Sequence, residues 1–219
     1  ESVIARDLSR FVSPEVAARI TTAARELRPG DGEVRTASVL FTDIEGFSTI
    51  AERLPPERLM AMLNAYFAAV SDAIERHGGV ITQYQGDAML ITFNTVKDDP
   101  DHAANAVRTA LAIQDATRER SFGEGLRMRT RCGINTGRIV AGAVGTGERL
   151  LYTVHGDEVN VAARLEQLNK KTGTYVLATE STVQAAGAAF AFERVAELTV
   201  RGRSQPTAVY APLAAGQAA

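Results

Sequence analysis

A single cysteine, Cys132, is all the thiol chemistry that the 219-residue sequence contains. It has no partner for an intrachain disulfide, which excludes a disulfide-stabilised secreted scaffold and suits a reducing compartment such as the cytoplasm. No apolar run approaches the roughly 20 residues of a membrane-spanning helix, and no signal-peptide pattern opens the chain. Because the chain begins with Glu1 rather than Met, we expect it to be a fragment of a longer protein. We expect this fragment to be cytoplasmic and without membrane contact, although the full-length protein could be attached to a membrane.

The sequence also lacks a strong excess of either charge, since 24 basic and 26 acidic residues leave a formal net charge of −2. This balance argues against a nucleic-acid-binding protein that depends on a basic surface. Hydrophobic residues make up 45% and charged residues 23%, close to the globular average, which excludes a disordered chain. The length predicts one domain with an appendage, or two small domains, able to fold without a disulfide or a structural metal.

A linker divides the sequence near its start. Val3–Leu27 has apolar residues at helical spacing, and the run of Pro and Gly in Arg28–Gly32 ends this pattern. We therefore predict an N-terminal helical segment with its linker at 1–32, a main domain at 33–212 and a disordered tail at 213–219.

The main domain alternates short apolar runs with amphipathic stretches. Apolar stripes predict helices at Glu57–Arg76, Asp101–Arg120 and Glu158–Leu168. The order strand, helix, strand-turn-strand, helix, strand is that of the split βαβ unit of ferredoxin-like folds, so we predict an α+β domain with an antiparallel-rich sheet and flanking helices. The predicted strands are Ala37–Phe41, Val80–Tyr84, Ala88–Phe93, a hairpin of Met128–Asn135 and Arg138–Val144 around Thr136-Gly137, Tyr175–Ala178, Phe190–Glu193 and Val209-Tyr210.

Two aspartates stand at positions where a carboxylate is informative. Asp43 ends an apolar strand, where a carboxylate needs a partner, and Asp87 lies in the predicted turn Gln85-Gly86-Asp87. Asp is also common in turns for local reasons, so Asp87 taken alone favours a structural role. In a split βαβ unit, however, the first strand and the hairpin are neighbours. Two carboxylates at one point suit Mg²⁺, and the backbone around Gly46 is suited to cradle a phosphate.

A second set of polar residues lies on and near the predicted helix Glu158–Leu168. Asn160 and Arg164 are four residues apart and share one helix face, which taken alone is typical of an exposed polar face. Two further arginines, Arg131 and Arg201, fall on predicted strands, and Arg grips phosphate oxygens in a bidentate manner. Together these residues favour a phosphate-containing ligand.

Five stretches, taken in order, resemble the catalytic domains of class III nucleotidyl cyclases, and the resemblance extends from about Val34 to Pro212. Each stretch is weak evidence alone, and their common order makes the resemblance specific. They are Phe41-Thr42-Asp43-Ile44-Glu45-Gly46-Phe47, Gln85-Gly86-Asp87, Arg131-Cys132-Gly133-Ile134-Asn135-Thr136-Gly137, Val159-Asn160-Val161-Ala162-Ala163-Arg164 and Val200-Arg201-Gly202-Arg203.

The resemblance implies an activity: conversion of a nucleoside triphosphate to a 3′,5′-cyclic monophosphate and pyrophosphate at the interface of a homodimer. It implies that Asp43, Asp87 and the Ile44 carbonyl hold two divalent ions, Mg²⁺ or Mn²⁺. It implies phosphate contacts from Gly46, Phe47, Arg131 and Arg201, the last replacing the family's usual Lys. The partner subunit would contribute Asn160 to position the ribose and Arg164 to stabilise the transition state.

The resemblance places Gln83 and Thr153 where the family reads the base. Adenylyl cyclases usually have Lys at the first position and Asp, or Thr in one subclass, at the second. A Gln amide and a Thr hydroxyl each offer a donor and an acceptor, so they suit adenine or guanine. Thr153 favours the adenylyl subclass and ATP, with some GTP turnover expected because neither residue is charged.

Two other classes of function stay open at this point. One is a cyclase specific for GTP or a pyrimidine nucleotide, and the other is a non-catalytic nucleotide-binding regulatory domain. The second is disfavoured because the residues that a degenerate copy usually loses are all present. The N-terminal segment is either a plain amphipathic helix or, by resemblance, a transducing helix that links the domain to an upstream sensor.

The remaining chemistry-bearing residues have structural interpretations. We expect His77 and His102 to be exposed helix caps, and His155 to border the base pocket without binding a metal. Cys132 should be a small buried hydrophobe. Met60, Met62 and Phe67 should form core or dimer contacts.

Overall fold

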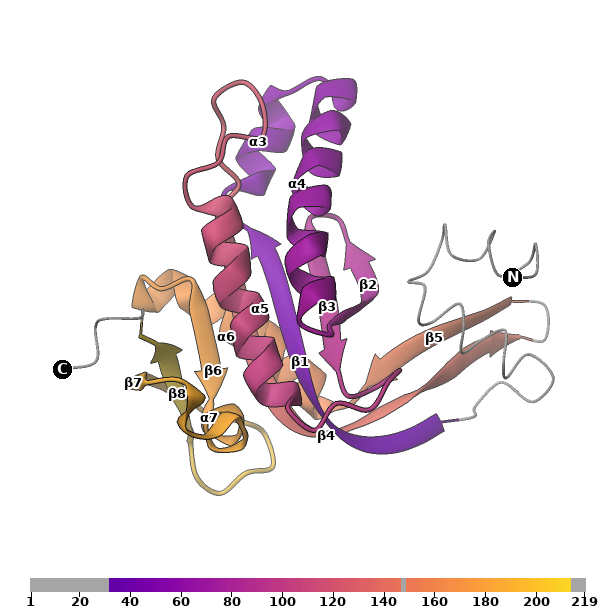
Figure 1. The fold of residues 1–219 in the computed structure, drawn as a ribbon, viewed down its shortest axis with the longest axis vertical. Coiled ribbons are helices and arrows are strands. Elements are labelled where there is room, and N and C mark those ends of the chain that lie inside the picture. Colours follow the sequence, from indigo (N-terminus) through magenta and orange to yellow (C-terminus); the bar gives the residue numbers. More distant parts are fainter. Residues whose placement is uncertain (1–31, 147–148, 214–219) are drawn as a thin grey trace.

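The computed structural model describes residues 32–146 and 149–213, which build one eight-stranded sheet with helices on both faces (Figure 1). The strand order is β2–β3–β1–β4–β6–β8–β7, and β5 pairs with β4 outside this path. The predicted N-terminal helical segment and the predicted tail lie outside the described residues, except Gly32 and Leu213. The strands are β1 (Gly32–Ile44), β2 (Val80–Gln85), β3 (Ala88–Phe93), β4 (Thr130–Thr146), β5 (Arg149–His155), β6 (Val176–Thr179), β7 (Phe192–Leu198) and β8 (Thr207–Pro212).

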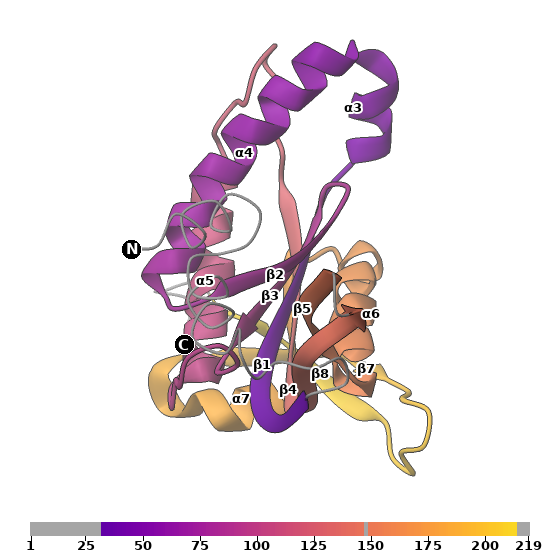
Figure 2. The same ribbon diagram turned by 90° about the vertical axis from the view of Figure 1, so that its right-hand side faces the viewer.

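Helices cover the sheet unequally. Helices α4 (Pro56–Arg76) and α5 (His102–Thr117) lie on one face and α6 (Asp157–Thr172) on the other, while the β4–β5 ribbon extends away from the body (Figures 1 and 2). Strand β1 alternates between the layers: Leu40 packs with the α4 and α5 side chains, and Val39 packs with Ala162 of α6. The predicted α+β class with flanking helices is confirmed.

Local sequence explains where α4 begins and ends. Pro56 occupies its first turn, where the missing N–H costs nothing, and Gly78 follows it with a left-handed φ of 80°. The buried stripe of α4 includes Tyr66, whose hydroxyl lies 2.6 Å from Thr130 Oγ1 on β4. This bond satisfies the phenol within the core, where burying a large side chain contributes about 1.5–3 kcal/mol.

The three residues Met60, Met62 and Phe67 do not form one cluster. Met62 is buried in the main core and Phe67 packs against that core, whereas Met60 is 56% exposed. Of the three residues, Met60 is the exposed one in the described part of the chain, and it is absent from the buried stripe of α4.

The predicted turn at Thr136-Gly137 was wrong. Strand β4 runs through these residues without a break, and its residues from Thr130 to Gly142 pair with β1. Its hairpin partner is β5, which includes Thr153. Gly137 is needed for another reason: a β-carbon there would fall 2.8 Å from the side chain of Glu158 on α6. The glycine therefore makes room for a helix side chain and does not turn the chain.

Arg201 lies in the turn between β7 and β8 and not on a strand, so that prediction was also wrong. The adjoining Gly202 has a φ of 84°, which is a turn conformation that glycine adopts without strain.

His102 is not an exposed cap, as the sequence had suggested. It is half-buried, and its Nδ1 lies 2.8 Å from Ser38 Oγ on β1. Ser38 Oγ also lies 2.7 Å from Thr136 Oγ1, and Thr136 in turn contacts Thr182 of α7 (Glu180–Ala186) at 3.0 Å. Burial lowers the pKa of His102 against the opposing charges of nearby carboxylates.

None of the helices within 32–146 and 149–213 combines the length and the hydropathy that crossing a membrane requires.

Candidate active site

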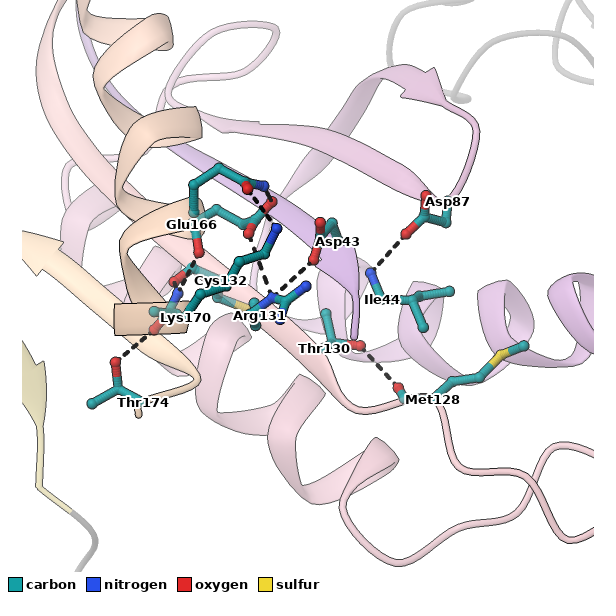
Figure 3. A network of polar contacts seen from close by, with 12 residues as sticks. Asp43, Ile44, Asp87, Met128, Thr130, Arg131, Cys132, Glu166, Lys170 and Thr174 are labelled. Atoms are coloured by element: carbon teal, nitrogen blue, oxygen red, sulfur yellow. Dashed lines mark hydrogen bonds and ion pairs between the residues drawn. The ribbon is translucent and has the colours of Figure 1, made fainter. Parts of the chain in front are cut away.

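Two carboxylates meet where β1 ends. Asp43 is the penultimate residue of β1, and Asp87 lies in the turn between β2 and β3, which pairs with β1. Asp87 Oδ2 accepts a hydrogen bond from the backbone N–H of Ile44 at 2.9 Å (Figure 3). Burial raises the pKa of Asp87, and the negative charge of Asp43 adds to this shift. A cation between the two carboxylates would relieve that repulsion.

Arg131 lies opposite Asp43 on β4, and its Nε donates to Asp43 Oδ1 at 3.2 Å. The same Nε lies 3.7 Å from Oε2 of Glu166, a residue of α6 whose side chain is 0% exposed (Figure 3). Burial, and then the charge of Asp43, raise the pKa of Glu166 to about 8. The guanidinium group of Arg131 therefore lies close to the carboxyl groups of both Asp43 and Glu166, in an environment with little exposure to solvent.

Sequence reasoning missed Glu166. Its spacing offered a signal, because Ala162, Glu166 and Asn169 share the buried face of α6, and an acidic residue among buried positions needs a partner.

Helix α6 presents a different set of residues outward. Asn160 and Arg164 are exposed on the face away from the sheet, and Arg164 Nη2 donates to the carbonyl of Thr199 at 2.9 Å. Within the described residues, neither side chain contacts Asp43 or Arg131. Both side chains are therefore exposed to solvent, where another molecule can reach them.

A pocket of about 440 Å³ adjoins this outward face. Its lining includes Phe41 of β1, Gln83 of β2, His155 of β5 and Asn160 of α6, which are four different elements of the fold. Gln83 follows a register shift in β2 and its side chain is exposed to the pocket. The side chain of Thr153 lies outside the described residues, and the backbone of Thr153 pairs with Gly142.

The predicted phosphate contacts lie at two separate places. Gly46, with a φ of 70°, directly precedes Phe47, the first residue of the short helix α3 (Phe47–Arg53), beside Asp43. Arg201 is exposed in the β7–β8 turn, which is tied to α6 by an ion pair between Arg203 and Glu158.

The oxygen atoms of Asp43, Asp87 and Ile44 suit an open Mg²⁺ or Mn²⁺ site, in which other ligands complete the coordination, and do not suit a metal site closed by protein ligands alone. Over residues 32–146 and 149–213, no group of three or more His, Cys, Asp or Glu side chains is arranged to bind a metal. Mg²⁺ needs only one or two carboxylates when phosphate oxygens and water complete its shell. Asp43, Asp87 and the carbonyl of Ile44 form such an incomplete set.

Comparison with known proteins shows the family of the chain. Residues 31–211 match the model of the adenylate and guanylate cyclase catalytic domain. The chain belongs to this family of nucleotide cyclases. The predicted resemblance is confirmed.

Individual members of the cyclase family differ in substrate. The chain is 40% identical over 179 residues to adenylate cyclase 1 of Rhizobium meliloti, covering 79% of this chain and 27% of that relative. The structure resembles the adenylyl cyclase CyaB from P. aeruginosa, with a TM-score of 0.75, 26% identity and coverage of 85% and 98% of the two chains. It also resembles the guanylyl cyclase Cya2, with a TM-score of 0.73, 28% identity and coverage of 85% and 96%. The chain thus spans about a quarter of its Rhizobium relative.

Proposed function

We propose that this cyclase domain converts ATP to 3′,5′-cyclic AMP and pyrophosphate at a site shared by two copies of the chain. The carrying observation is that one chain holds two sets of polar residues, here called half-sites, and that within the described residues Asn160 and Arg164 do not contact Asp43 or Arg131. Asp43, Asp87 and Arg131 form an acidic and basic cluster at the end of β1. Gln83 and Asn160 line a separate pocket. A second copy would bring the pocket of one chain to the cluster of the other.

Each half-site has its own task in this proposal. Asp43 and Asp87, with the Ile44 carbonyl, would hold two divalent ions, Mg²⁺ or Mn²⁺. When bound, such ions lower the pKa of the ribose 3′-hydroxyl and neutralise charge on the phosphates. Arg131, with the Gly46 and Phe47 backbone, would bind the triphosphate beside them.

The partner copy would complete the reaction. Its Asn160 orients the ribose so that the 3′-oxygen faces the α-phosphorus in line with the leaving group. The 3′-hydroxyl gives its proton to solvent water and its oxygen bonds to the α-phosphorus, while the bond from that phosphorus to the bridging oxygen breaks and pyrophosphate leaves. Arg164 stabilises the charge that develops on the α-phosphate, and Arg201 grips the departing phosphates.

A second candidate substrate is GTP. Gln83 supports it, because its amide can rotate to serve guanine as well as adenine, and the guanylyl cyclase Cya2 has a similar fold. The Rhizobium relative, an adenylate cyclase, favours ATP as the first choice.

The test is to measure the cyclic product from each of the four nucleoside triphosphates, with Mg²⁺ and then with Mn²⁺. We expect ATP to give the highest kcat/KM and GTP a measurable lower value. A preference for GTP would replace the adenylyl assignment. Nucleotide binding without product under any condition would instead make this a regulatory domain that binds nucleotide.

A further inference from the structure

The roles proposed above leave one buried acidic residue, Glu166, without a task. Its side chain is 0% exposed, and its Oε2 accepts no hydrogen bond from any residue that the structure describes, although Arg131 Nε lies 3.7 Å away. Its Oε1 accepts from Gln167 Nε2 at 2.8 Å. A buried carboxyl group with an incompletely satisfied oxygen costs stability, so its presence calls for a reason beyond filling space.

The backbone is built to bring Glu166 to this point. Gly133 on β4 lets α6 approach so closely that a β-carbon at Gly133 would fall 2.4 Å from the backbone nitrogen of Glu166. Asn169, one turn further along α6, fixes the helix by donating to the Cys132 carbonyl at 2.9 Å. Glu166 is therefore held against the strand that carries Arg131.

The contact between Glu166 and Arg131 is specific in its atoms. Arg131 uses Nε toward both Asp43 and Glu166, and in the described part of the chain no side-chain bond engages its Nη1 or Nη2. The two Nη groups are the ones that can bind phosphate oxygens in a bidentate manner. Once Asp43 binds a cation, Glu166 is the acceptor that remains on the Nε side.

We infer that Glu166 is a positioning residue: its carboxyl oxygen holds Arg131 by Nε, so that the guanidinium faces the triphosphate while Asp43 turns to the metal. This inference rests on the proposed function, because it assigns a helper to the proposed phosphate contact of Arg131. Helix α6 would then contribute to two active sites. Glu166 would act in the site whose metal ligands come from its own chain, and Asn160 and Arg164 would act in the site whose metal ligands come from the partner chain.

Two substitutions separate positioning from space filling. Glu166→Met keeps the unbranched shape and removes the acceptor, and we expect it to raise KM for the triphosphate about tenfold, the loss of about one hydrogen bond to a charged group, with kcat within about threefold. Glu166→Gln keeps an acceptor oxygen and should restore KM to within about threefold of the parent. In both variants Arg131 keeps its bond to Asp43, and Glu166 Oε2 accepts no hydrogen bond from the described residues, so a purely structural role predicts unchanged KM for both folded variants.

Mixed dimers locate the effect. An Asp43→Ala chain and an Arg164→Ala chain should each be inactive alone and regain one working site when combined, in which Asp43, Arg131 and Glu166 come from the Arg164→Ala chain. Adding Glu166→Met to that chain should raise KM about tenfold, and adding it to the Asp43→Ala chain should leave KM unchanged. The second placement is the control, because the substitution has the same effect on folding stability in either chain.

The outcomes distinguish the two proposals. If the inactive chains fail to complement each other, the shared site itself is wrong. If they complement but Glu166→Met acts equally from both chains, or from neither, or if Glu166→Gln is as impaired as Glu166→Met, the positioning role is overturned.

Discussion

Gly133 lies directly beneath α6, so close that a β-carbon at this position would fall 2.3 Å from the carbonyl oxygen of Ala162. The contact is with helix backbone, which cannot swing aside as a side chain can. This single close approach sets the height of α6 above the sheet, and with it the positions of the residues on both faces of the helix.

The first prediction concerns this approach. Gly133→Ala should lower the free energy of unfolding by at least about 1–3 kcal/mol, because the added methyl group overpacks a rigid contact. Urea unfolding measures this loss. Gly32→Ala is the matched control, since its β-carbon would lie 3.2 Å from a side-chain methyl of Val140 and, at an ordinary contact distance of 3.8 Å, from the carbonyl oxygen of Ala141. It should change stability by less than about 0.5 kcal/mol. Equal stability of the two variants would contradict the packing argument.

The second prediction concerns Asp87. Asp87→Asn should retain the fold, because the amide oxygen can still accept from the Ile44 N–H, and should lower kcat/KM at least about 100-fold, because the negative charge is lost. Product assays at increasing Mn²⁺, together with thermal unfolding, separate the two effects. Full activity in a folded variant would remove Asp87 from the metal set.

The third prediction concerns the choice of base. Gln83→Glu should raise the ratio of kcat/KM for GTP to that for ATP by about tenfold or more, since a carboxylate accepts from guanine and has no donor for adenine N1. Gln85→Glu is the control, because Gln85 lines the same pocket and receives the same charge. An equal shift in both variants would point to a general charge effect.

The fourth prediction concerns Cys132, which is fully buried on β4 and hydrogen-bonded weakly by Gln114. Burial raises the pKa of its thiol, so little nucleophilic thiolate forms in the folded protein. A thiol-specific chromogenic reagent should therefore label the native chain slowly and the denatured chain stoichiometrically. Rapid full labelling of folded protein would show that β4 is open to solvent.

The fifth prediction concerns pH and stability. Burial lowers the pKa of His102 despite the opposing charges of Asp99 and Asp101, so the folded state resists protonation more than the unfolded state. The free energy of unfolding should thus fall as pH drops through the ordinary histidine value of about 6.5. His102→Gln should weaken this fall, measured by urea unfolding at pH 7.5 and 5.5. An unchanged slope would assign the pH dependence to other groups.

Residues at the ends of strands could be predicted from the sequence. The sequence predicts that Asp43 and Asp87 lie close together. The apolar run and the tight turn are local patterns, and the split βαβ order makes the strand that carries Asp43 a neighbour of the hairpin that carries Asp87. Asn160 and Arg164 could be placed on one face because helical spacing alone decides that.

Features that depend on distant packing could not be read in the same way. Gly137 resembled a turn because glycine next to a small polar residue is typical of one, and only the position of Glu158 shows its real use. Glu166 was overlooked because its two partners lie on strands far away in the sequence. The position of His102 at a helix end predicts an exposed cap, whereas its half-buried ring contacts Ser38 of β1, which lies far away in the sequence.

Tyr66 gives the chain an optical consequence. The sequence has five tyrosines and no tryptophan, so its near-ultraviolet emission comes from phenol groups alone. Burial raises the pKa of the Tyr66 phenol, whose hydroxyl forms a hydrogen bond with Thr130. The hydroxyl should therefore ionise only when high pH unfolds the core. A spectrophotometric titration to high pH should then end in a cooperative, time-dependent step, and one tryptophan added at an exposed site would report on its surroundings without background.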